Sequence, residues 1–497
     1  MTPRKRLLLI TPPYHAGVVE SAGRWPNVGL AYVGGQVRAA GFEVSIYDAM
    51  TKEVGLPEIA ARIREFRPDF VGCASYTASF PAAMDVLRTA KEVDPRIVTL
   101  MGGIHANFMY DEILRDHPDV DFVVRGEGEL TTPQLLRALA EPGAPGAARV
   151  RGIAYRAGEG AGLKIAATPP QPFVPDLDRL APAWDLLDWE DYTFYVLPGS
   201  RLGIVSSSRG CLNACNFCSQ QRFWHRTYRQ RSAESFVAEL EHLRDLHGVT
   251  VVMLADEYPT LDAERWHRIL DLLIEREVGV YLLLETVVGD IIRDRHLLEK
   301  YRRAGVVHVY LGVEATTDDR LASFNKNVRV RDSREALRLL NQAGIVTECS
   351  FVLGMPDDTA ETVEQTLELA YHYDADMPHF LLIAPWPYAD LYPQLEPHII
   401  TRDYSKYNFV EPVVKPRAMA PEELKGAVLR CYRDYYSHKA ADFPRLADSF
   451  KRDYLCRSVE VMMKNSFLAR HMQAAGAGMP AWVREMLEGF KAPVAPR

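Results

Sequence analysis

Short apolar runs alternate with helical patterns over the first part of the chain. Five runs are nearly continuous and rich in β-branched residues, as expected for strands that are buried on both faces. They span 6–13, 42–49, 69–75, 97–103 and 121–126. The stretches between them, such as LPEIAARIREFRP, place apolar residues at helical spacing. This alternation predicts an α/β domain at 1–145, doubly wound and Rossmann-like, with about five parallel strands.

A second alternation of the same kind fills 201–400. Its expected strands are 202–208, 250–256, 279–286, 307–314, 347–354 and 379–385. Six βα units predict a (β/α)6 partial barrel. Residues 146–200 read as a small hairpin followed by a proline-rich linker. The segment 401–497 is rich in aromatic and basic residues and predicts a helical C-terminal domain.

Loops at the carboxyl ends of the expected strands are the places where such sheets bind ligands. In the first domain these loops read TPPYHAG, SYTASF, GGIHANF and RGEGE. Their glycines allow a backbone to approach a ligand closely. We therefore expect one ligand site at this edge of the first sheet.

Three of the seven cysteines fall in SSSRGCLNACNFCSQQRFW, directly after the first strand of the second alternation. A structural zinc site needs four ligands, and His225 is the nearest candidate for a fourth. The alternative is a [4Fe–4S] cluster, in which each iron usually takes one thiolate. Cys211, Cys215 and Cys218 would then leave one iron open to a substrate or cofactor. The scattered cysteines at 73, 349, 431 and 456 are interpreted as core residues.

This CxxxCxxC spacing resembles the signature of the radical S-adenosylmethionine (SAM) superfamily, including an aromatic residue, Phe217, before the third cysteine. The resemblance implies that the open iron binds the amino and carboxylate groups of SAM. An electron from the cluster then cleaves SAM to methionine and a 5′-deoxyadenosyl radical. It also implies SAM contacts from Asp256, Glu257, Glu285 and Glu314. A solvated loop at the first two residues and a structural ion pair at Glu314 are the alternatives.

An α/β domain before such a barrel resembles the cobalamin-binding subclass of that superfamily. The DxHxxG motif is absent, so no histidine ligation to cobalt is expected. A nucleotide-binding domain without cobalamin is the alternative. The resemblance implies that the strand-end loops line the corrin, through His15, Ser75, Thr77, Gly102, Gly103, His105, Gly126 and Glu127.

Longer segments resemble the anaerobic magnesium-protoporphyrin IX monomethyl ester oxidative cyclases of bacteriochlorophyll biosynthesis. They include GRWPNVGLAYVGG, FNKNV and APWPYADLYPQL, and the similarity runs from about residue 6 to 440. The family reaction closes the isocyclic ring from a methyl propionate side chain, and water supplies the new oxo oxygen. The implied substrate is a porphyrin ester, with reduced flavodoxin or ferredoxin as electron donor.

The segment FWHRTYRQR offers groups that could hold such a substrate near the cluster. Trp224 could stack on a macrocycle, and Arg226, Arg229 and Arg231 could hold carboxylates. A solvated basic face is the alternative. Two other functions stay open: a cobalamin-dependent radical SAM methyltransferase, and a non-catalytic iron–sulfur or corrinoid protein that acts as a sensor or carrier.

Net charge and hydropathy indicate which partners and which cellular compartment to expect. The net charge of −8 argues against a broad polyanion-binding surface, so nucleic acid is not an expected partner. No apolar run approaches the roughly 18 residues of a membrane span. The start, MTPRKRLLLITPPYH, predicts a first strand rather than a signal peptide. We therefore expect a cytoplasmic protein, whose thiols stay reduced.

Overall fold

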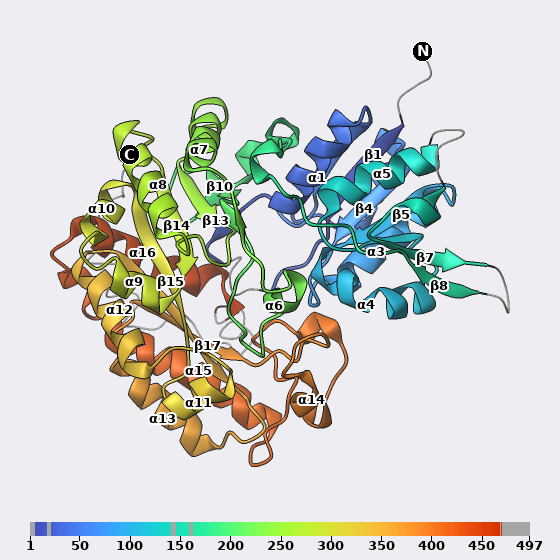
Figure 1. Cartoon of the computed structure of the whole chain (residues 1–497). Coiled ribbons are helices and arrows are strands. Elements are labelled where there is room, and N and C mark those ends of the chain that lie inside the picture. Colours follow the sequence, from blue (N-terminus) through green and yellow to red (C-terminus); the bar gives the residue numbers. More distant parts are fainter. Residues whose placement is uncertain (1–4, 17–20, 141–145, 159–162, 468, 470–497) are drawn as a thin grey trace. The chain divides into compact units, whose positions relative to one another are not determined.

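The computed structural model describes residues 5–16, 21–140, 146–158, 163–467 and 469. The chain divides into two compact units (Figure 1). The first comprises Met1–His15 and Pro26–Asp191, and the second comprises Ala16–Trp25 and Tyr192–Arg497. Among the described residues, no helix combines the length and the apolar character that crossing a bilayer requires.

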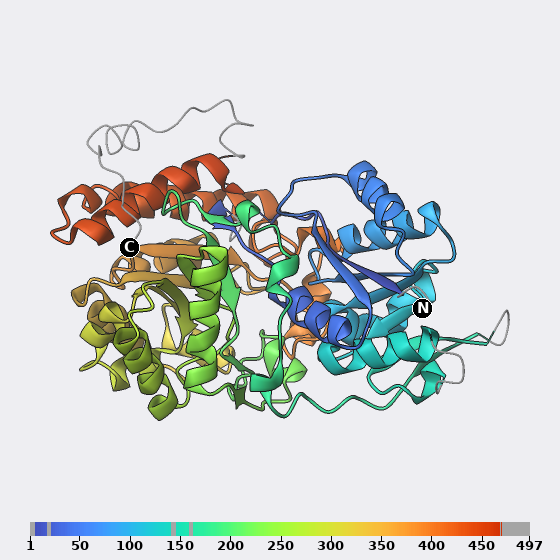
Figure 2. The same ribbon diagram turned by 90° about the horizontal axis from the view of Figure 1, so that it is seen from above.

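The first unit is built on a parallel sheet with the order β3-β1-β4-β5-β6, which confirms the doubly wound prediction. The order reverses between β1 and β4, where such folds bind ligands. Helices α1 and α5 pack together on one face, and α2 and α3 pack together on the other (Figure 2). The bounds are β1 (Arg6–Thr11), α1 (Val28–Ala39), β3 (Glu43–Asp48), α2 (Leu56–Phe66), β4 (Phe70–Ala74), α3 (Phe80–Val93), β5 (Val98–Gly102), α4 (Gly103–Asp116), β6 (Phe122–Val124) and α5 (Gly128–Ala140).

The hairpin expected after residue 145 extends this sheet. Strand β7 (Ile153–Ala157) pairs antiparallel with β6, and β8 (Lys164–Ala167) pairs antiparallel with β7. Val150 and Ile153 are buried in the core of the first unit. The structure therefore groups 146–191 with the N-terminal strands, because backbone pairing at the sheet edge joins the hairpin to them.

The second unit contains six parallel strands in sequential order, which confirms the partial barrel. The strands are β10 (Leu202–Val205), β13 (Val251–Leu254), β14 (Tyr281–Thr286), β15 (Val306–Glu314), β16 (Val346–Leu353) and β17 (Met377–Leu382). The connecting helices are α7 (Ala233–His247), α8 (Ala263–Glu275), α9 (Val288–Arg293), α10 (Leu298–Arg303), α11 (Asp318–Ser323), α12 (Val330–Gln342) and α13 (Ala360–Tyr371).

Helix α8 shows how local sequence forms these connections. The Asp262 side chain caps the helix by accepting a hydrogen bond from the backbone N–H of Arg265, at 3.0 Å. Trp266, Ile269 and Leu270 recur at helical spacing and are fully buried. One capped amphipathic stripe thus fixes where the helix begins and which face it buries.

Two long helices, α15 (Pro421–Lys439) and α16 (Ser449–Asn465), belong to the second unit. The Tyr435 hydroxyl donates to the carbonyl of Ala375 at 2.9 Å and ties α15 to the approach of β17. Residues 470–497 of the expected C-terminal domain lie outside the described residues. Short elements complete the unit: β2 (Gly23–Arg24) with β9 (Thr193–Phe194), β11 (Ser208–Arg209) with β12 (Arg229–Gln230), α6 (Gln220–Phe223) and α14 (Tyr392–Leu395).

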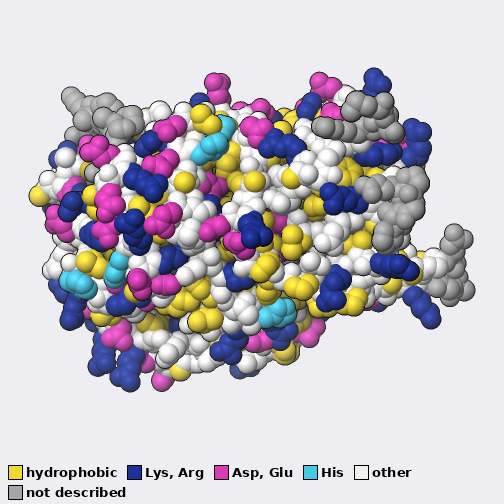
Figure 3. Space-filling view, turned by 45° about the horizontal axis from the view of Figure 1, so that its top comes forward, with side chains coloured by type: hydrophobic (Ala, Val, Ile, Leu, Met, Phe, Trp, Pro, Cys, Tyr) yellow, Lys and Arg dark blue, Asp and Glu magenta, His cyan; other side chains and the backbone are white. Residues whose placement is uncertain are grey.

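The surface carries charges of both signs. On the face shown in Figure 3, acidic and basic side chains are interspersed rather than gathered by sign. This mixture accompanies a net charge of −8 over the whole chain.

Candidate active site

The three clustered cysteines lie on the loop after β10 and β11, at the carboxyl end of the second sheet. Cys211, Cys215 and Cys218 are half-buried free thiols, and burial raises the pKa of Cys218 to about 12. Within the described ranges, no group of three or more His, Cys, Asp or Glu side chains is arranged to hold a metal ion. Three thiols on one loop match the cysteine ligation of a [4Fe–4S] cluster with one iron left open.

The segment after α11 braces the cysteine loop. The Asn216 backbone N–H donates to the carbonyl of Phe324 at 3.1 Å, and its side-chain amide donates to the carbonyl of Ser323 at 2.8 Å. The amide of Asn325 donates to the carbonyl of Ala214 at 2.7 Å. Residues distant in sequence therefore hold the loop on its β15 side.

Phe217 packs within this brace. Its ring meets Phe324 edge-on, with centroids 5.3 Å apart. On the other side of the loop, the Gln221 amide donates to Asp390 at 2.7 Å and to the carbonyl of Cys215 at 3.1 Å. Protein contacts alone thus anchor the cysteine loop at both sides.

Asp256 is engaged inside the protein. Its carboxylate accepts hydrogen bonds from the backbone N–H and hydroxyl of Ser207, at 2.7 and 2.6 Å, and from the hydroxyl of Ser208 at 2.6 Å. It is 3% exposed. Asp256 therefore shapes the chain just before the cysteines, and its contact with SAM stays a prediction.

Glu257 joins the cysteine loop to the turn that follows it. Its carboxylate accepts from Trp224 Nε1 at 2.7 Å and from the backbone N–H of Gly210 at 3.1 Å. Gly210 has φ +98°, and a Cβ there would lie 2.1 Å from the carbonyl oxygen of Thr227. Trp224 is buried, and the guanidinium of Arg229 lies 5.5 Å from its ring centroid. These two side chains support the turn, and their contact with substrate stays a prediction.

The basic residues of this segment have different surroundings. His225 and Arg226 are exposed and have φ of 52° and 53°, in the left-handed region that costs a non-glycine residue about 1–2 kcal/mol. Arg231, by contrast, is buried and forms an ion pair with Glu239. Of the three arginines expected to hold carboxylates, the structure exposes Arg226 and buries Arg231.

A half-buried cation, Lys326, lies within electrostatic range of the Cys215 thiol. The Lys326 ammonium lies 2.8 Å from the Glu314 carboxylate, which also accepts from Ser350 Oγ at 3.2 Å. Burial disfavours the ammonium form, but the charge of Glu314 outweighs this and raises the pKa of Lys326. Burial raises the pKa of the Cys215 thiol, and the neighbouring ammonium opposes that shift.

Glu285 is the penultimate residue of β14 and is in register with Tyr310 of β15. Its side chain is exposed, although enough protein atoms lie around the carboxylate to desolvate it. This desolvation, together with the charge of Glu314, raises the pKa of Glu285 to about 7. Glu285 and Glu314 thus lie together near the cysteine loop, as two of the expected SAM contacts should.

Sequence reasoning missed Lys326 and Asn325. Both lie in FNKNV, a segment outside any strand end, so no strand pattern drew attention to them. The available signal was a lone lysine between two asparagines, twelve residues after Glu314. Only the fold shows that this lysine reaches the thiols.

The first unit gathers its predicted residues at the ends of adjacent strands. Ser75 and Thr77 follow β4, and Gly103 and His105 follow β5. Gly103 has φ +89°, and a Cβ there would lie 2.6 Å from the backbone N and O of Ser75. His105 Nδ1 lies 3.1 Å from Thr77 Oγ1, and burial lowers the pKa of His105 to about 3, so the imidazole is neutral.

The Ser75 hydroxyl is an unusual feature of these loops. It is 2% exposed, and Oγ has no hydrogen-bond partner among the described residues. A buried hydroxyl without a partner costs about 1–3 kcal/mol. An orphaned hydroxyl beside a close backbone contact fits the approach of a polar ligand group, as a corrinoid would provide.

The other predicted corrin contacts differ in accessibility. His15 is exposed after β1, and Gly102 ends β5. The Gly126 N–H donates to the Asn107 side chain at 2.8 Å, whereas Glu127 accepts from the backbone N–H of Val174 at 2.6 Å. Glu127 thus fastens the 174 segment to this loop, and its contact with cobalamin stays a prediction.

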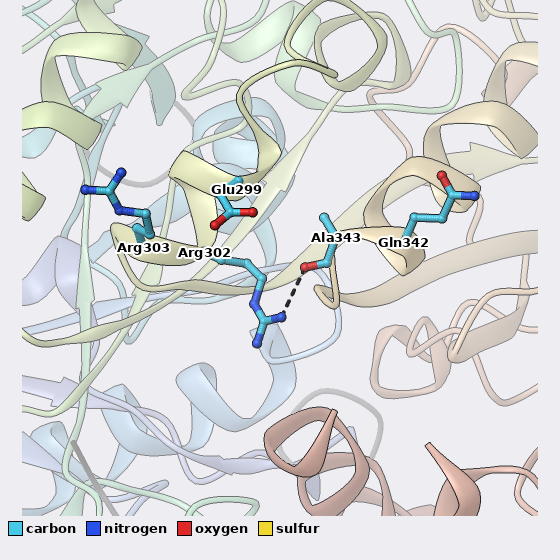
Figure 4. Close-up of a pocket in the computed structure, with 5 residues that line it drawn as sticks. All are labelled: Glu299, Arg302, Arg303, Gln342 and Ala343. Carbon is cyan, nitrogen blue, oxygen red and sulfur yellow. Dashed lines mark hydrogen bonds between the residues drawn. The ribbon is translucent and has the colours of Figure 1, made fainter. Parts of the chain in front are cut away.

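A surface pocket lies elsewhere in the second unit. It is lined by Glu299, Arg302 and Arg303 of α10 and by Gln342 and Ala343 at the end of α12 (Figure 4). These helices lead into the starts of β15 and β16, so the pocket lies at the amino edge of the sheet. None of the predicted site residues lines it.

Comparisons with known proteins agree with this two-part organisation. Residues 14–136 match the B12 binding domain, and residues 205–370 match the radical SAM superfamily. The structure of the radical S-adenosylmethionine methyltransferase TsrM from Kitasatospora setae, with cobalamin and a [4Fe–4S] cluster bound, superposes with a TM-score of 0.69. That match covers 95% of this chain and 100% of TsrM at 17% identity, so it shows a shared fold.

Curated relatives are much closer in sequence. The anaerobic magnesium-protoporphyrin IX monomethyl ester cyclase of Rubrivivax gelatinosus is 40% identical over 93% of this chain and 83% of its own length. The cyclase of the same name from Cereibacter sphaeroides is 37% identical over 92% of this chain and 75% of its own length. The chain therefore belongs to the family of the anaerobic magnesium-protoporphyrin IX monomethyl ester cyclases, with a B12 binding domain followed by a radical SAM domain.

Proposed function

We propose that this protein is the oxidative cyclase that forms the isocyclic ring of (bacterio)chlorophyll from magnesium-protoporphyrin IX monomethyl ester. The observation that carries the proposal is 40% identity to a cyclase over 93% of the chain. The arrangement of thiols, carboxylates and an ammonium group at one edge of the barrel supports it. The cofactors are a [4Fe–4S] cluster, SAM and cobalamin.

The cluster with bound SAM supplies hydrogen-atom abstraction from an unactivated carbon, which side-chain acids and bases cannot perform. Cys211, Cys215 and Cys218 would hold three irons. Lys326 would meet the SAM carboxylate, since its ammonium is close enough to Cys215 for the two groups to influence each other's pKa. Glu285 and Glu314 would accept hydrogen bonds from SAM.

In the first unit, the neutral groups at the strand ends would hold cobalamin. Ser75 Oγ offers a free hydrogen-bonding group, and Gly103 lets two loops approach closely. Because His105 is buried and neutral, it would pack against the ligand rather than carry a charge. Gly102, Gly126 and the exposed His15 complete the proposed rim, with Glu127 holding the loop.

The substrate is a large flat macrocycle with carboxylate and ester groups, and such ligands need an apolar surface with a few polar anchors. Arg226 would anchor a carboxylate, and Trp224 with Arg229 would support that turn. The magnesium ion arrives within the substrate. We further propose that reduced flavodoxin or ferredoxin donates electrons, and that the enzyme works in the cytoplasm.

The test is an anaerobic assay with reconstituted cluster, cobalamin, SAM, reductant and the porphyrin ester, followed by mass analysis. A cyclised product and 5′-deoxyadenosine are expected. S-adenosylhomocysteine with a methylated product would instead indicate methyl transfer and contradict the proposal. The Cys215→Ala variant serves as the inactive control.

A further inference from the structure

Four polar side chains contact one another in a row inside the barrel, and none has a role in the site described above. The two oxygens of Glu348 lie 2.5 Å from His379 Nε2 and 2.8 Å from His308 Nε2. His308 Nδ1 lies 2.8 Å from the Tyr454 hydroxyl of α16. Strands β15, β16 and β17 and one helix thus supply one connected network.

One end of this network is accessible and the other is closed. Along β17, Met377, His379 and Leu381 are half-buried, while the residues between them are fully buried. The His379 side chain is 19% exposed, whereas Tyr454 is fully buried. The neighbouring Phe380 packs against Tyr432 and Tyr435 of α15, so by strand alternation His379 lies on the opposite face of the sheet, the face of its register partner Ser350.

The accessible end lies close to the proposed SAM site. His379 pairs in register with Ser350 of β16. The Ser350 hydroxyl donates to Glu314, which in turn holds Lys326 beside Cys215. A ligand reaching into the barrel below SAM would therefore meet His379.

The proton positions in the network follow from the donor and acceptor types. A carboxylate only accepts, so Nε2 of His379 carries a hydrogen toward Glu348, whereas His308 Nε2 lies 2.8 Å from the carboxylate without hydrogen-bond geometry. Burial raises the pKa of Glu348, but the two histidines outweigh this and hold it well below its usual range. No described residue bonds to His379 Nδ1, which leaves its lone pair directed away from the carboxylate.

The proposed reaction releases protons inside the barrel. A propionate methylene that has lost a hydrogen atom, and then one electron to a corrinoid-class acceptor, is a carbocation. Addition of water forms the C–O bond of an alcohol and releases one proton. A base placed within hydrogen-bond reach of that water accelerates such a step about 100- to 10,000-fold.

Resting on the proposed function, we propose that His379 is the base that accepts this proton at Nδ1. Glu348 and His308 are positioning residues: the carboxylate fixes the ring and stabilises the imidazolium that forms. When water adds to the substrate, the released proton makes His379 an imidazolium. The Glu348 carboxylate, on the strand between β15 and β17, stabilises that charge.

The test compares wild type, His379→Gln and Glu348→Gln in the fully loaded enzyme. The ratio of cyclised product to 5′-deoxyadenosine should fall at least about 100-fold in His379→Gln and about 10-fold in Glu348→Gln. SAM cleavage and the absorbance of cluster and cobalamin should stay near wild type. Added imidazole should restore part of the product in His379→Ala.

The exposed His296 supplies the matched control, and His296→Gln should keep the wild-type ratio. An unchanged ratio in His379→Gln overturns the inference. So does loss of the cluster and cobalamin absorbance in both network variants, because it would mark the network as structural. Failure of wild type itself to form a new ring would instead overturn the proposed function, so the two failures are distinguishable.

Discussion

In the second unit a charged set, the carboxylates of Glu285 and Glu314 and the ammonium of Lys326, accompanies the three thiols, whereas the first unit offers a neutral set of glycines, hydroxyls and a neutral histidine at Ser75, Thr77, Gly103 and His105. Both sets lie at the carboxyl edge of a parallel sheet. The charged set suits a zwitterionic ligand and electron transfer. The neutral set suits a bulky ligand that is held by close backbone approach, so one architecture serves two kinds of cofactor.

The largest expected effect concerns the thiols, which only the second unit carries as a cluster. Cys218→Ala removes one of three iron ligands, so SAM cleavage should fall below detection. Iron content should drop, while cobalamin bound per chain stays near wild type. Cys456→Ala, at a buried cysteine of α16, is the matched control and should cleave SAM normally. Full cleavage by Cys218→Ala would contradict the cluster assignment.

The second largest expected effect is on SAM affinity and concerns the Lys326 ammonium. Lys326→Ala leaves the Glu314 carboxylate without its cation, and SAM affinity should fall about 10- to 100-fold. Lys326→Arg should retain most of the affinity, which equilibrium binding measures. Lys425→Ala breaks a more exposed pair with Glu411 and should leave SAM binding unchanged. Equal affinities for Lys326→Ala and wild type would remove Lys326 from the site.

The neutral set can be tested through one glycine. Gly103→Ala places a methyl group 2.6 Å from the Ser75 backbone, so cobalamin retention should fall at least about tenfold. The control Gly41→Ala also has positive φ but meets nothing within 4 Å. Both should lose about 1–2 kcal/mol of stability to backbone strain, and Gly103→Ala should lose more because its methyl group clashes with the Ser75 backbone. If both retain cobalamin equally, close approach at Gly103 does not matter for binding.

The smallest effect concerns Glu285, whose pKa is raised from 4.5 to about 7. A raised carboxyl pKa in the folded state contributes stability below pH 4.5 that is lost as the pH rises through about 7. The melting temperature of the cofactor-free wild type should therefore decline relative to Glu285→Gln between pH 5 and 8. The relative change should stay below about 2 °C, because solvent screens the accessible carboxylate. A constant difference would contradict the shift.

The sequence predicted the strands well because their apolar runs are continuous. The expected strand 202–208 is observed as Leu202–Val205, and 307–314 as Val306–Glu314. Pairing of the hairpin strand β7 with β6 was not predictable, since edge pairing depends on contacts distant in sequence.

In the candidate site, too, the sequence predicts local motifs but not contacts between distant segments. The cysteine motif and the strand-end acids could be read from spacing. The engagement of Asp256 by Ser207 and Ser208, and the reach of Lys326 to the thiols, depend on loops that meet only in the folded chain. The His308–Glu348–His379 network spans three strands and has no local signature.

We expect the charged set and the neutral set both to serve ring formation, with water as the source of the new oxygen. The direct measurement is anaerobic turnover of the porphyrin ester in isotopically labelled water, followed by mass analysis. We predict a product with a new ring whose oxo group carries the label. A methylated porphyrin without a new ring, formed with S-adenosylhomocysteine, would contradict the account.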